Sequence, residues 1–240
     1  MIKNNAESFA GDDIFSVKQI KRRHFLQFTG ASALAAGLAG CKKDHPAEFE
    51  APYVNTDNTI DFKDDTGLLN YIYALEQLEA AFYIKAAESL PATFTPTQVL
   101  FFNDIKLHEI AHREFFKRIL GSAAIGNLTL DFSAINFTDA NAVLTTAKTF
   151  EDLGVAAYND AIVRSKNDYN LIILSQIATV EARHAAYVRS QVDTLGFADL
   201  NQLSALGADA ANALDVSLAP AKVLEQALKY IKTKLNVINL

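Results

Sequence analysis

Between Thr66 and Leu195 the apolar residues of this chain recur every three or four positions. That spacing places apolar side chains on one face of an α-helix, whereas a half-buried strand alternates with a period of two. The pattern is clearest near the start of the region, in the residues Leu68, Leu69, Ile72, Leu75, Leu78, Phe82 and Ala86. No segment shows a convincing strand alternation. We therefore predict an all-α protein.

Capping residues and helix breakers divide this region into four long helices. The predicted helices cover residues 66–90, 96–120, 139–165 and 168–195. The second has the clearest boundaries. Thr95, Pro96 and Gln98 form an N-cap, a proline at the first helical position and a capping-box partner, and Gly121 follows the last turn. A further helix is predicted from Pro220 to near the C-terminus, where it packs across the other helices or makes a dimer contact.

The lengths of the connections indicate how the helices are arranged. The first and third links are short, which makes their helices antiparallel neighbours, whereas residues 121–137 form a long connection that can cross the length of a bundle. We predict a four-helix bundle with a long crossover between helices 2 and 3 and an additional C-terminal helix. An array of TPR-like repeats is the structural competitor, but no repeat of about 34 residues is visible.

Each of the four helices carries a glutamate with a partner at a fixed spacing. The first and third have Glu-x6-Tyr and the second and fourth have Glu-x2-His, as the pairs Glu76/Tyr83, Glu151/Tyr158, Glu109/His112 and Glu181/His184. The two halves of the region look like copies of one helical hairpin. Residues three apart lie on one helix face, so a Glu-x2-His pair can hold one metal ion from a single helix.

Together these residues supply four carboxylates and two imidazoles. Such a set suits two divalent ions, iron or manganese, bridged by carboxylates in the core of a bundle. Four carboxylates also match the charge of two divalent cations. Without cations, four converging buried carboxylates would not all stay ionised.

The N-terminus has the features of an export signal. A basic cluster that includes Arg22 and Arg23 precedes a short apolar stretch and resembles the twin-arginine signal, although Lys21 departs from the usual Ser or Thr, so ordinary secretion stays an alternative. Residues 38–41 look like a lipobox, which implies cleavage before Cys41 and lipidation of its thiol. We expect a protein anchored to a membrane by that lipid, in the periplasm or cell envelope.

The pattern of glutamates and histidines on the four helices resembles that of the ferritin-like superfamily, which includes ferritins, rubrerythrins and manganese catalases. With its export signal, the chain is similar to bacterial ferritin-like domain proteins related to desiccation-associated proteins. The resemblance covers roughly Thr66 to Leu195 and implies the metal ligands Glu76, Glu109, His112, Glu151, Glu181 and His184. Glu109 and Glu181 would be the bridging pair. Glu79 would replace or supplement Glu76, while Tyr83, Tyr158 and His108 would lie beside the ligands.

The expected organisation has four parts: an export signal (1–40), a flexible tether (41–65), the metal-binding bundle (66–196) and a C-terminal extension (197–240). The chain has 28 acidic and 22 basic residues, a net charge of -6, which argues against nucleic-acid binding. The single cysteine excludes an internal disulfide.

A second metal motif overlaps the first. His108, Glu109 and His112 match H-E-x-x-H, in which two histidines bind zinc and the glutamate is the general base of a peptidase. A third ligand is hard to find, because Arg118 occupies the position of the third histidine in the extended motif and no glutamate lies between Glu114 and Glu151.

Three classes of function fit a two-metal bundle. The first is an oxidoreductase of ferroxidase, peroxidase or catalase type that acts on dioxygen or peroxide. The second is metal binding without turnover, and the third is a structural or stress-protective envelope protein with a vestigial or purely structural site. The presence of all six candidate ligands argues against a vestigial site, because buried carboxylates without a metal would cost stability. We therefore expect a two-metal protein with a role in oxidative-stress defence or metal handling.

Overall fold

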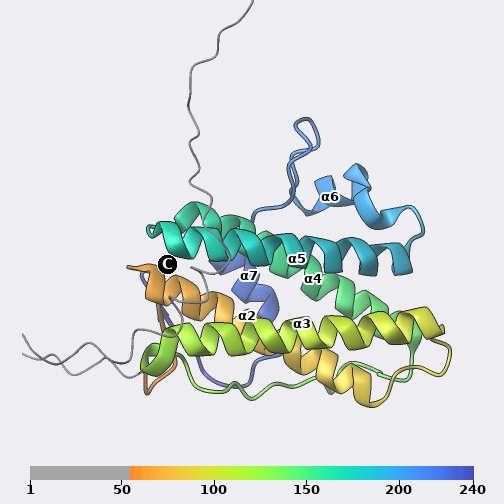
Figure 1. Ribbon diagram of the computed structural model, residues 1–240, viewed down its shortest axis with the longest axis horizontal. Coiled ribbons are helices and arrows are strands. Elements are labelled where there is room, and N and C mark those ends of the chain that lie inside the picture. The colour runs from red at the N-terminus through yellow and green to blue at the C-terminus, as the bar shows by residue number, and fades with distance from the viewer. Residues whose placement is uncertain (1–54) are drawn as a thin grey trace, which may run out of the picture. The chain divides into compact units, whose positions relative to one another are not determined.

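Four long helices form the core of the protein in a computed structural model that describes residues 55–240 (Figure 1). They are α2 (Asp65–Glu88), α3 (Pro96–Leu120), α4 (Ala140–Arg164) and α5 (Asp168–Val192), which confirms the all-α prediction. The predicted export signal with Arg22 and Arg23, the lipidation site Cys41 and residues 41–54 of the tether lie outside the described residues. Within the described part, no helix combines the length and hydropathy needed to span a bilayer.

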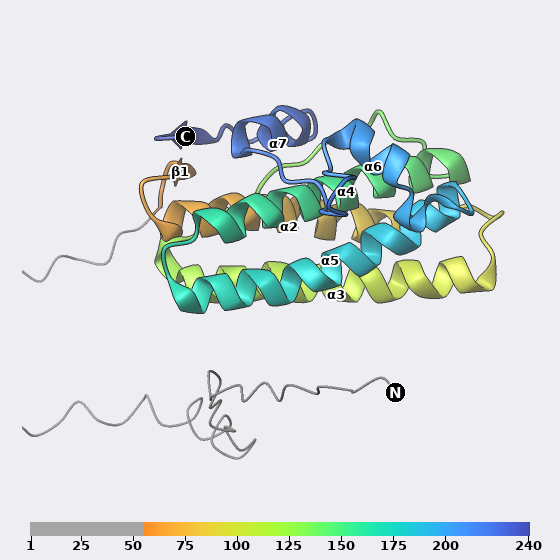
Figure 2. The same ribbon diagram turned by 90° about the horizontal axis from the view of Figure 1, so that it is seen from above.

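The helices pack as two hairpins. α2 packs on α3 and α4 packs on α5, and the two hairpins meet through α2 with α4 and through side chains of α3 and α5 (Figure 2), such as the stacked rings of Phe101 and Tyr187 with centroids 3.8 Å apart. The connection after α3 begins with the 3₁₀-helix η1 (Gly121–Ala123) and runs along the bundle to the start of α4 (Figure 1). This connection is the crossover predicted from the sequence.

Side-chain caps define the N-termini of the four helices. Asp64, Thr95, Asp139 and Asn167 each accept hydrogen bonds from backbone N–H groups of the first turn. Such caps satisfy donors that have no partner within the helix. The predicted capping box of α3 is present, since Thr95 and Gln98 bond to each other's backbone N–H groups.

α2 is buried on almost every side because the crossover covers the face that the other helices leave free. Asn70 accepts a 2.7 Å hydrogen bond from the N–H of Ile125 and donates to the carbonyl of Ala123 at 2.8 Å. Gln77 accepts a 2.8 Å bond from the N–H of Leu128. The two side-chain amides thus pair with backbone groups of the crossover that have no partner in a helix or sheet. These hydrogen bonds hold the crossover against α2.

The tether prediction is wrong for the part that the structure describes. Strand β1 (Thr59–Asp61) pairs in parallel with strand β2 (Asn236–Ile238), and Ile60 is fully buried. A three-residue strand is too short to show an alternating pattern. Its partner also comes from the opposite end of the chain, so local sequence gives no sign of the pairing.

The C-terminal extension also differs from the prediction. The expected long last helix is a short one, α7 (Pro220–Ala227), and an unpredicted helix, α6 (Leu200–Leu206), follows the 3₁₀-helix η2 (Gly196–Ala198). After α7 the N–H of Lys232 bonds to the carbonyl of Thr129 at 2.8 Å, and Ile231 forms a bridge with Leu130. Pairing with the crossover takes the place of further helical turns. Of the two predicted roles for the last helix, α7 makes the intramolecular contact, with α4 and α2.

Candidate metal centre

The six predicted ligands come together at the centre of the bundle. α2 contributes Glu76 and α4 contributes Glu151, while α3 and α5 each contribute a Glu-x2-His pair. All four glutamates are fully buried, and His184 is 5% exposed. Burial at this depth is unusual for carboxylates unless they are paired or bind metal.

The ligands form two overlapping groups in which the possible ligand atoms lie within 4.8 Å of one another. One group is Glu76, Glu109, His112 and Glu181, and the other is Glu109, Glu151, Glu181 and His184. Glu109 and Glu181 belong to both groups. The two residues that the resemblance implies as bridging ligands are thus the ones that lie close to both histidines.

Each histidine lies closest to the glutamate of the opposite Glu-x2-His helix. Nδ1 of His112 is 2.9 Å from Oε1 of Glu181, and Nδ1 of His184 is 2.9 Å from Oε1 of Glu109. The distances from each Nδ1 to the glutamate of its own helix are longer, 3.7 Å for His112 and 3.6 Å for His184. The two halves of the centre are therefore related by an approximate twofold axis.

The two tyrosines of the Glu-x6-Tyr pairs bond crosswise. Tyr83 of α2 donates to Oε1 of Glu151 on α4 at 2.5 Å, and Tyr158 of α4 donates to Oε1 of Glu76 on α2. Burial and the adjacent carboxylate raise the pKa of both phenols well above the usual value, so they remain donors. Each tyrosine thus orients the glutamate of the other hairpin, which the sequence spacing did not reveal.

His108 lies beside the centre and is not part of it. Its Nδ1 is 2.9 Å from Nε2 of His184, and the two rings stack with centroids 5.1 Å apart. A partner on Nε2 orients the ring of His184 and leaves Nδ1 toward the carboxylates. Because His108 belongs to neither group, the geometry does not favour a zinc site made by His108 and His112.

Glu79 is a fifth carboxylate in this core and belongs to neither group. It is 3% exposed, and its Oε2 makes no hydrogen bond within the described residues. Burial and the charges of Glu181 and Glu109 raise its pKa well above the usual value. Its carboxyl packs against Gly154, where an added Cβ would lie only 2.7 Å from Oε1.

The electrostatics of the centre are those of carboxylates buried close to one another. Burial and the charge of Glu181 raise the pKa of Glu109 to about 8. Burial opposes the charged form of His112, yet contacts with Glu109, Glu181 and Glu76 outweigh it and raise its pKa to about 12. Burial also disfavours ionised Glu181, but His112 and His184 lower its pKa to about 2. The contacts with His112 and His184 thus favour the charged form of Glu181, while burial and the charge of Glu181 disfavour the charged form of Glu109.

The donor atoms of the site fit metal ions. Eight buried atoms of the six predicted ligands have no hydrogen-bond partner outside the cluster within the described residues, and their short contacts are with one another, such as Nδ1 of His112 with Oε1 of Glu181 at 2.9 Å. They are Oε2 of Glu76 and Glu151, both carboxylate oxygens of Glu109 and Glu181, and Nδ1 of His112 and His184. Buried polar atoms are ordinarily paired, and metal coordination would satisfy all eight.

Comparison with known proteins agrees with this geometry. The family model described as a ferritin-like domain matches residues 64–194, which cover just over half of the chain. All four long helices and all six predicted ligands lie within that match. No curated protein matches the chain. The matched segment and the bundle it forms show that the chain belongs to the ferritin-like domain family.

Proposed function

We propose that the protein binds two divalent metal ions, iron or manganese, between α2, α3, α4 and α5 and uses them in oxidative-stress defence or metal handling. The observation that carries this proposal is the set of eight buried ligand atoms that have no hydrogen-bond partner outside the cluster within the described residues. Their carrier residues provide four negative charges, which match two divalent ions. Oxygen and imidazole donors of this kind suit iron and manganese equally, so the ligand set does not choose between them.

The residues around the ions have separate roles in this proposal. Glu109 and Glu181, which both groups share, would hold both ions, and Glu76 with His112 and Glu151 with His184 would each hold one of them. Tyr83 and Tyr158 hold the two terminal glutamates in place. Bound ions would supply electron transfer to or from dioxygen or peroxide, the chemistry of a ferroxidase, peroxidase or catalase. The four glutamates are fully buried, so their carboxylates are shielded from bulk water.

The proposed location rests on the N-terminal sequence alone. The twin-arginine-like signal and the lipobox ending at Cys41 support an exported protein anchored by a lipid in the periplasm or cell envelope. Labelling with a radioactive fatty acid of cells that express the full chain and its Cys41→Ala variant tests this. We expect label in the native chain and none in the variant, and a native chain without label would rule the anchor out.

Elemental analysis tests the metal centre directly. The full chain is compared with a Glu109→Gln, Glu181→Gln double variant and with a Glu114→Gln control, since Glu114 lies on α3 but outside both groups. We expect about two ions of iron or manganese per chain in the native protein and the control, and a loss of both in the double variant.

Two other outcomes would overturn the proposal in different ways. One zinc per chain that survives Glu181→Gln and disappears in His108→Ala would establish the peptidase motif. Metal-free protein after exposure to both iron and manganese would support a structural or stress-protective bundle with a vestigial site. If two ions are found, consumption of dioxygen and hydrogen peroxide by the loaded protein then distinguishes a redox enzyme from a metal-binding protein.

A further inference from the structure

The two metal positions are alike in their inner contacts. One, the His112 position, also has Glu76, and the other, the His184 position, also has Glu151. Each histidine Nδ1 lies 2.9 Å from the glutamate of the opposite Glu-x2-His helix. Nδ1 is 3.6 Å from Glu76 in the first position and 3.5 Å from Glu151 in the second. A difference in metal affinity between the positions must therefore come from residues around the ligands.

At the other ring nitrogen the two histidines differ. Nε2 of His184 lies 2.9 Å from Nδ1 of His108, and the two rings stack with centroids 5.1 Å apart. Nε2 of His112 makes no hydrogen bond within residues 55–240. A neutral imidazole that binds metal through Nδ1 carries its proton on Nε2. His184 can therefore donate its Nε2–H to His108, and His112 has no matching contact.

The sequence explains this difference at a single pair of positions. His108 precedes His112 by four residues on α3, and the residue four before His184 on α5 is Val180. The approximate twofold axis that relates the two Glu-x2-His pairs also relates these two positions. A valine side chain has no hydrogen-bond acceptor. The contact from His184 to His108 thus has no counterpart from His112 to Val180.

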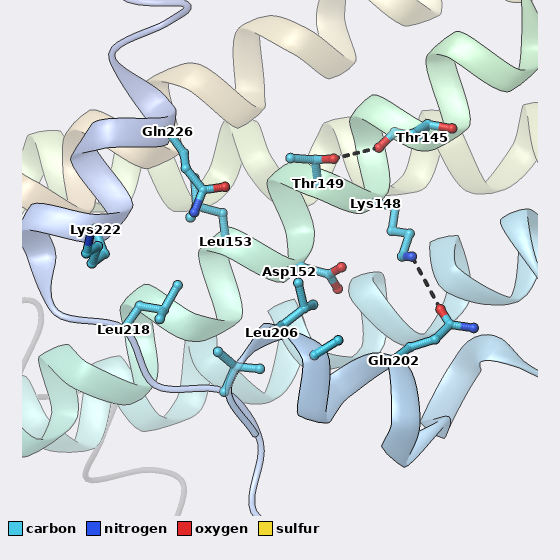
Figure 3. Close-up of a pocket in the computed structure, with 12 residues that line it drawn as sticks. Thr145, Lys148, Thr149, Asp152, Leu153, Gln202, Leu206, Leu218, Lys222 and Gln226 are labelled. Atoms are coloured by element: carbon cyan, nitrogen blue, oxygen red, sulfur yellow. Dashed lines mark hydrogen bonds between the residues drawn. The ribbon is translucent and has the colours of Figure 1, made fainter. Parts of the chain in front are cut away.

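A hollow on the surface between α3 and α5 reaches His184. Its lining includes His108 and His184, together with Phe101 and Tyr187. By contrast, the hollow between α4, α6 and α7 that Figure 3 shows is lined by none of the six predicted ligands. His108 is itself exposed. The contact between the two histidines therefore lies beside solvent, and His108 can be replaced without leaving a cavity in the core.

We propose that His108 is a positioning residue that makes the His184 position hold its metal ion more tightly than the His112 position, so that the two ions bind in order. This inference rests on the proposed two-metal function. By accepting the Nε2–H of His184, His108 fixes the tautomer and the orientation of the ring and makes Nδ1 a stronger ligand. Outer partners of this kind contribute about 10–100-fold in metal affinity, so we expect a difference of about tenfold.

Variants of the full chain that keep one position each test the difference. They are needed because repulsion between two bound ions would by itself weaken the second. Glu76→Gln removes a carboxylate from the His112 position alone, and Glu151→Gln removes one from the His184 position alone. In calorimetric titrations with manganese, Glu76→Gln should bind its remaining ion about tenfold more tightly than Glu151→Gln does. Equal affinities, or tighter binding by Glu151→Gln, would contradict the inference.

Variants of His108 show whether its acceptor atom is responsible. His108→Leu keeps an apolar side chain of similar size without an acceptor, whereas in His108→Asn an amide oxygen can take the place of Nδ1. In a chain with both positions intact, His108→Leu should lower the product of the two manganese association constants about tenfold. His108→Asn should restore most of that loss. Equal losses in two variants that fold equally well by circular dichroism would reduce His108 to a packing role.

A gain of affinity at the other position is the complementary test. In the Glu151→Gln chain, which keeps the His112 position, Val180→His should tighten manganese binding by up to about tenfold. Gln176→His, at an exposed residue one helical turn earlier, is the control and should change nothing. A native chain that binds no manganese or iron would overturn the proposed function and this inference with it. Two bound ions whose affinities are the same in His108→Leu would overturn this inference alone.

Discussion

Among single residues, Glu79 and Gly154 break the symmetry of the metal centre. α2 has Glu76 followed three residues later by Glu79, whereas α4 has Glu151 followed at the same spacing by Gly154. The Glu79 carboxyl occupies the space that a side chain on residue 154 would need. The two hairpins are therefore not interchangeable, although their metal-ligand patterns are.

Gly154→Ala should destabilise the metal-free protein by about 1–3 kcal/mol through overpacking. Helix propensity alone would favour alanine over glycine by up to about 1 kcal/mol, so a loss of stability is diagnostic of the clash. Urea unfolding of Gly154→Ala, Glu79→Ala and the double variant measures the coupling. We expect the double variant to lose less than the sum of the single losses. Strict additivity would show that the two residues do not compete for the same space.

The crosswise tyrosines make a second prediction for single residues. Tyr158→Phe leaves Oε1 of Glu76 without its donor and should weaken metal binding about tenfold at the position completed by His112, because groups that orient ligands typically contribute 10–100-fold in affinity. Tyr83→Phe should do the same at the position completed by His184. Titration of each variant with manganese, followed by electron paramagnetic resonance, measures binding at the two positions separately. Tyr73→Phe is the control, and an equal effect there would rule out a specific role.

At the level of secondary-structure elements, the two ends of the described chain are fastened together at the start of α2. β1 leads into this helix and pairs with β2 near the C-terminus, and Asn239 donates a 2.8 Å hydrogen bond to Asp61. Gly67 lies in the first turn of α2, where a Cβ would be only 1.7 Å from the backbone oxygen of Asp61. The strand pair thus depends on a glycine in the neighbouring helix.

Gly67→Ala should therefore lower the free energy of unfolding by at least about 3 kcal/mol, more than Gly154→Ala does. At Gly67 the backbone of Asp61 must move, whereas at Gly154 only the end of the Glu79 side chain must move. Thermal unfolding followed by circular dichroism gives the measurement. Thr66→Ala, at the exposed preceding residue, should change stability by no more than about 0.5 kcal/mol. A Gly67→Ala protein as stable as the Thr66→Ala control would mean that β1 does not need to lie so close to α2.

For the molecule as a whole, the buried charges link stability to pH. The folded-state pKa of Glu109, about 8, lies above its usual 4.5. Its contribution to the stability of the fold is therefore complete below pH 4.5 and is lost as the pH rises through 8. The pKa of His112 is raised from 6.5 to about 12, so its contribution to stability is complete below pH 6.5 and declines above that pH. Glu181 is lowered to about 2 and contributes above 4.5. The metal-free protein should thus be most stable near pH 5.

Between pH 5 and 8 we expect the metal-free protein to lose at least about 2 kcal/mol, which corresponds to a melting temperature lower by roughly 4–8 °C. Metal ions bind the deprotonated ligands, so added manganese or iron should stabilise the protein more at pH 8 than at pH 5. Thermal unfolding at both pH values, with and without metal, checks this. Glu109→Gln should flatten the metal-free profile. A melting temperature that rises from pH 5 to 8 without metal would contradict the assignment.

Much of this architecture was predictable because its determinants are local. Apolar spacing located the four long helices, and caps such as Thr95 with Gln98 located their ends to within a few residues. The lengths of the links predicted the crossover. The Glu-x2-His spacing predicted the ligand cluster, since it depends only on the 3.6-residue helical repeat. The tether and the last helix were mispredicted where pairing between distant segments, at β1 with β2 and at Ile231 with Leu130, determines the structure.

The sequence by itself determined the helices, their order and the six residues that meet in the core, because helical periodicity places those side chains on one face wherever the helices pack. Only the tertiary structure decided which of these residues contact one another. It showed that each tyrosine bonds to the glutamate of the other hairpin, that His108 contacts His184 and does not join His112 in a zinc site, and that Gly154 makes room for Glu79. These contacts join residues 68 to 82 positions apart, and such pairings are set by how whole helices pack against one another.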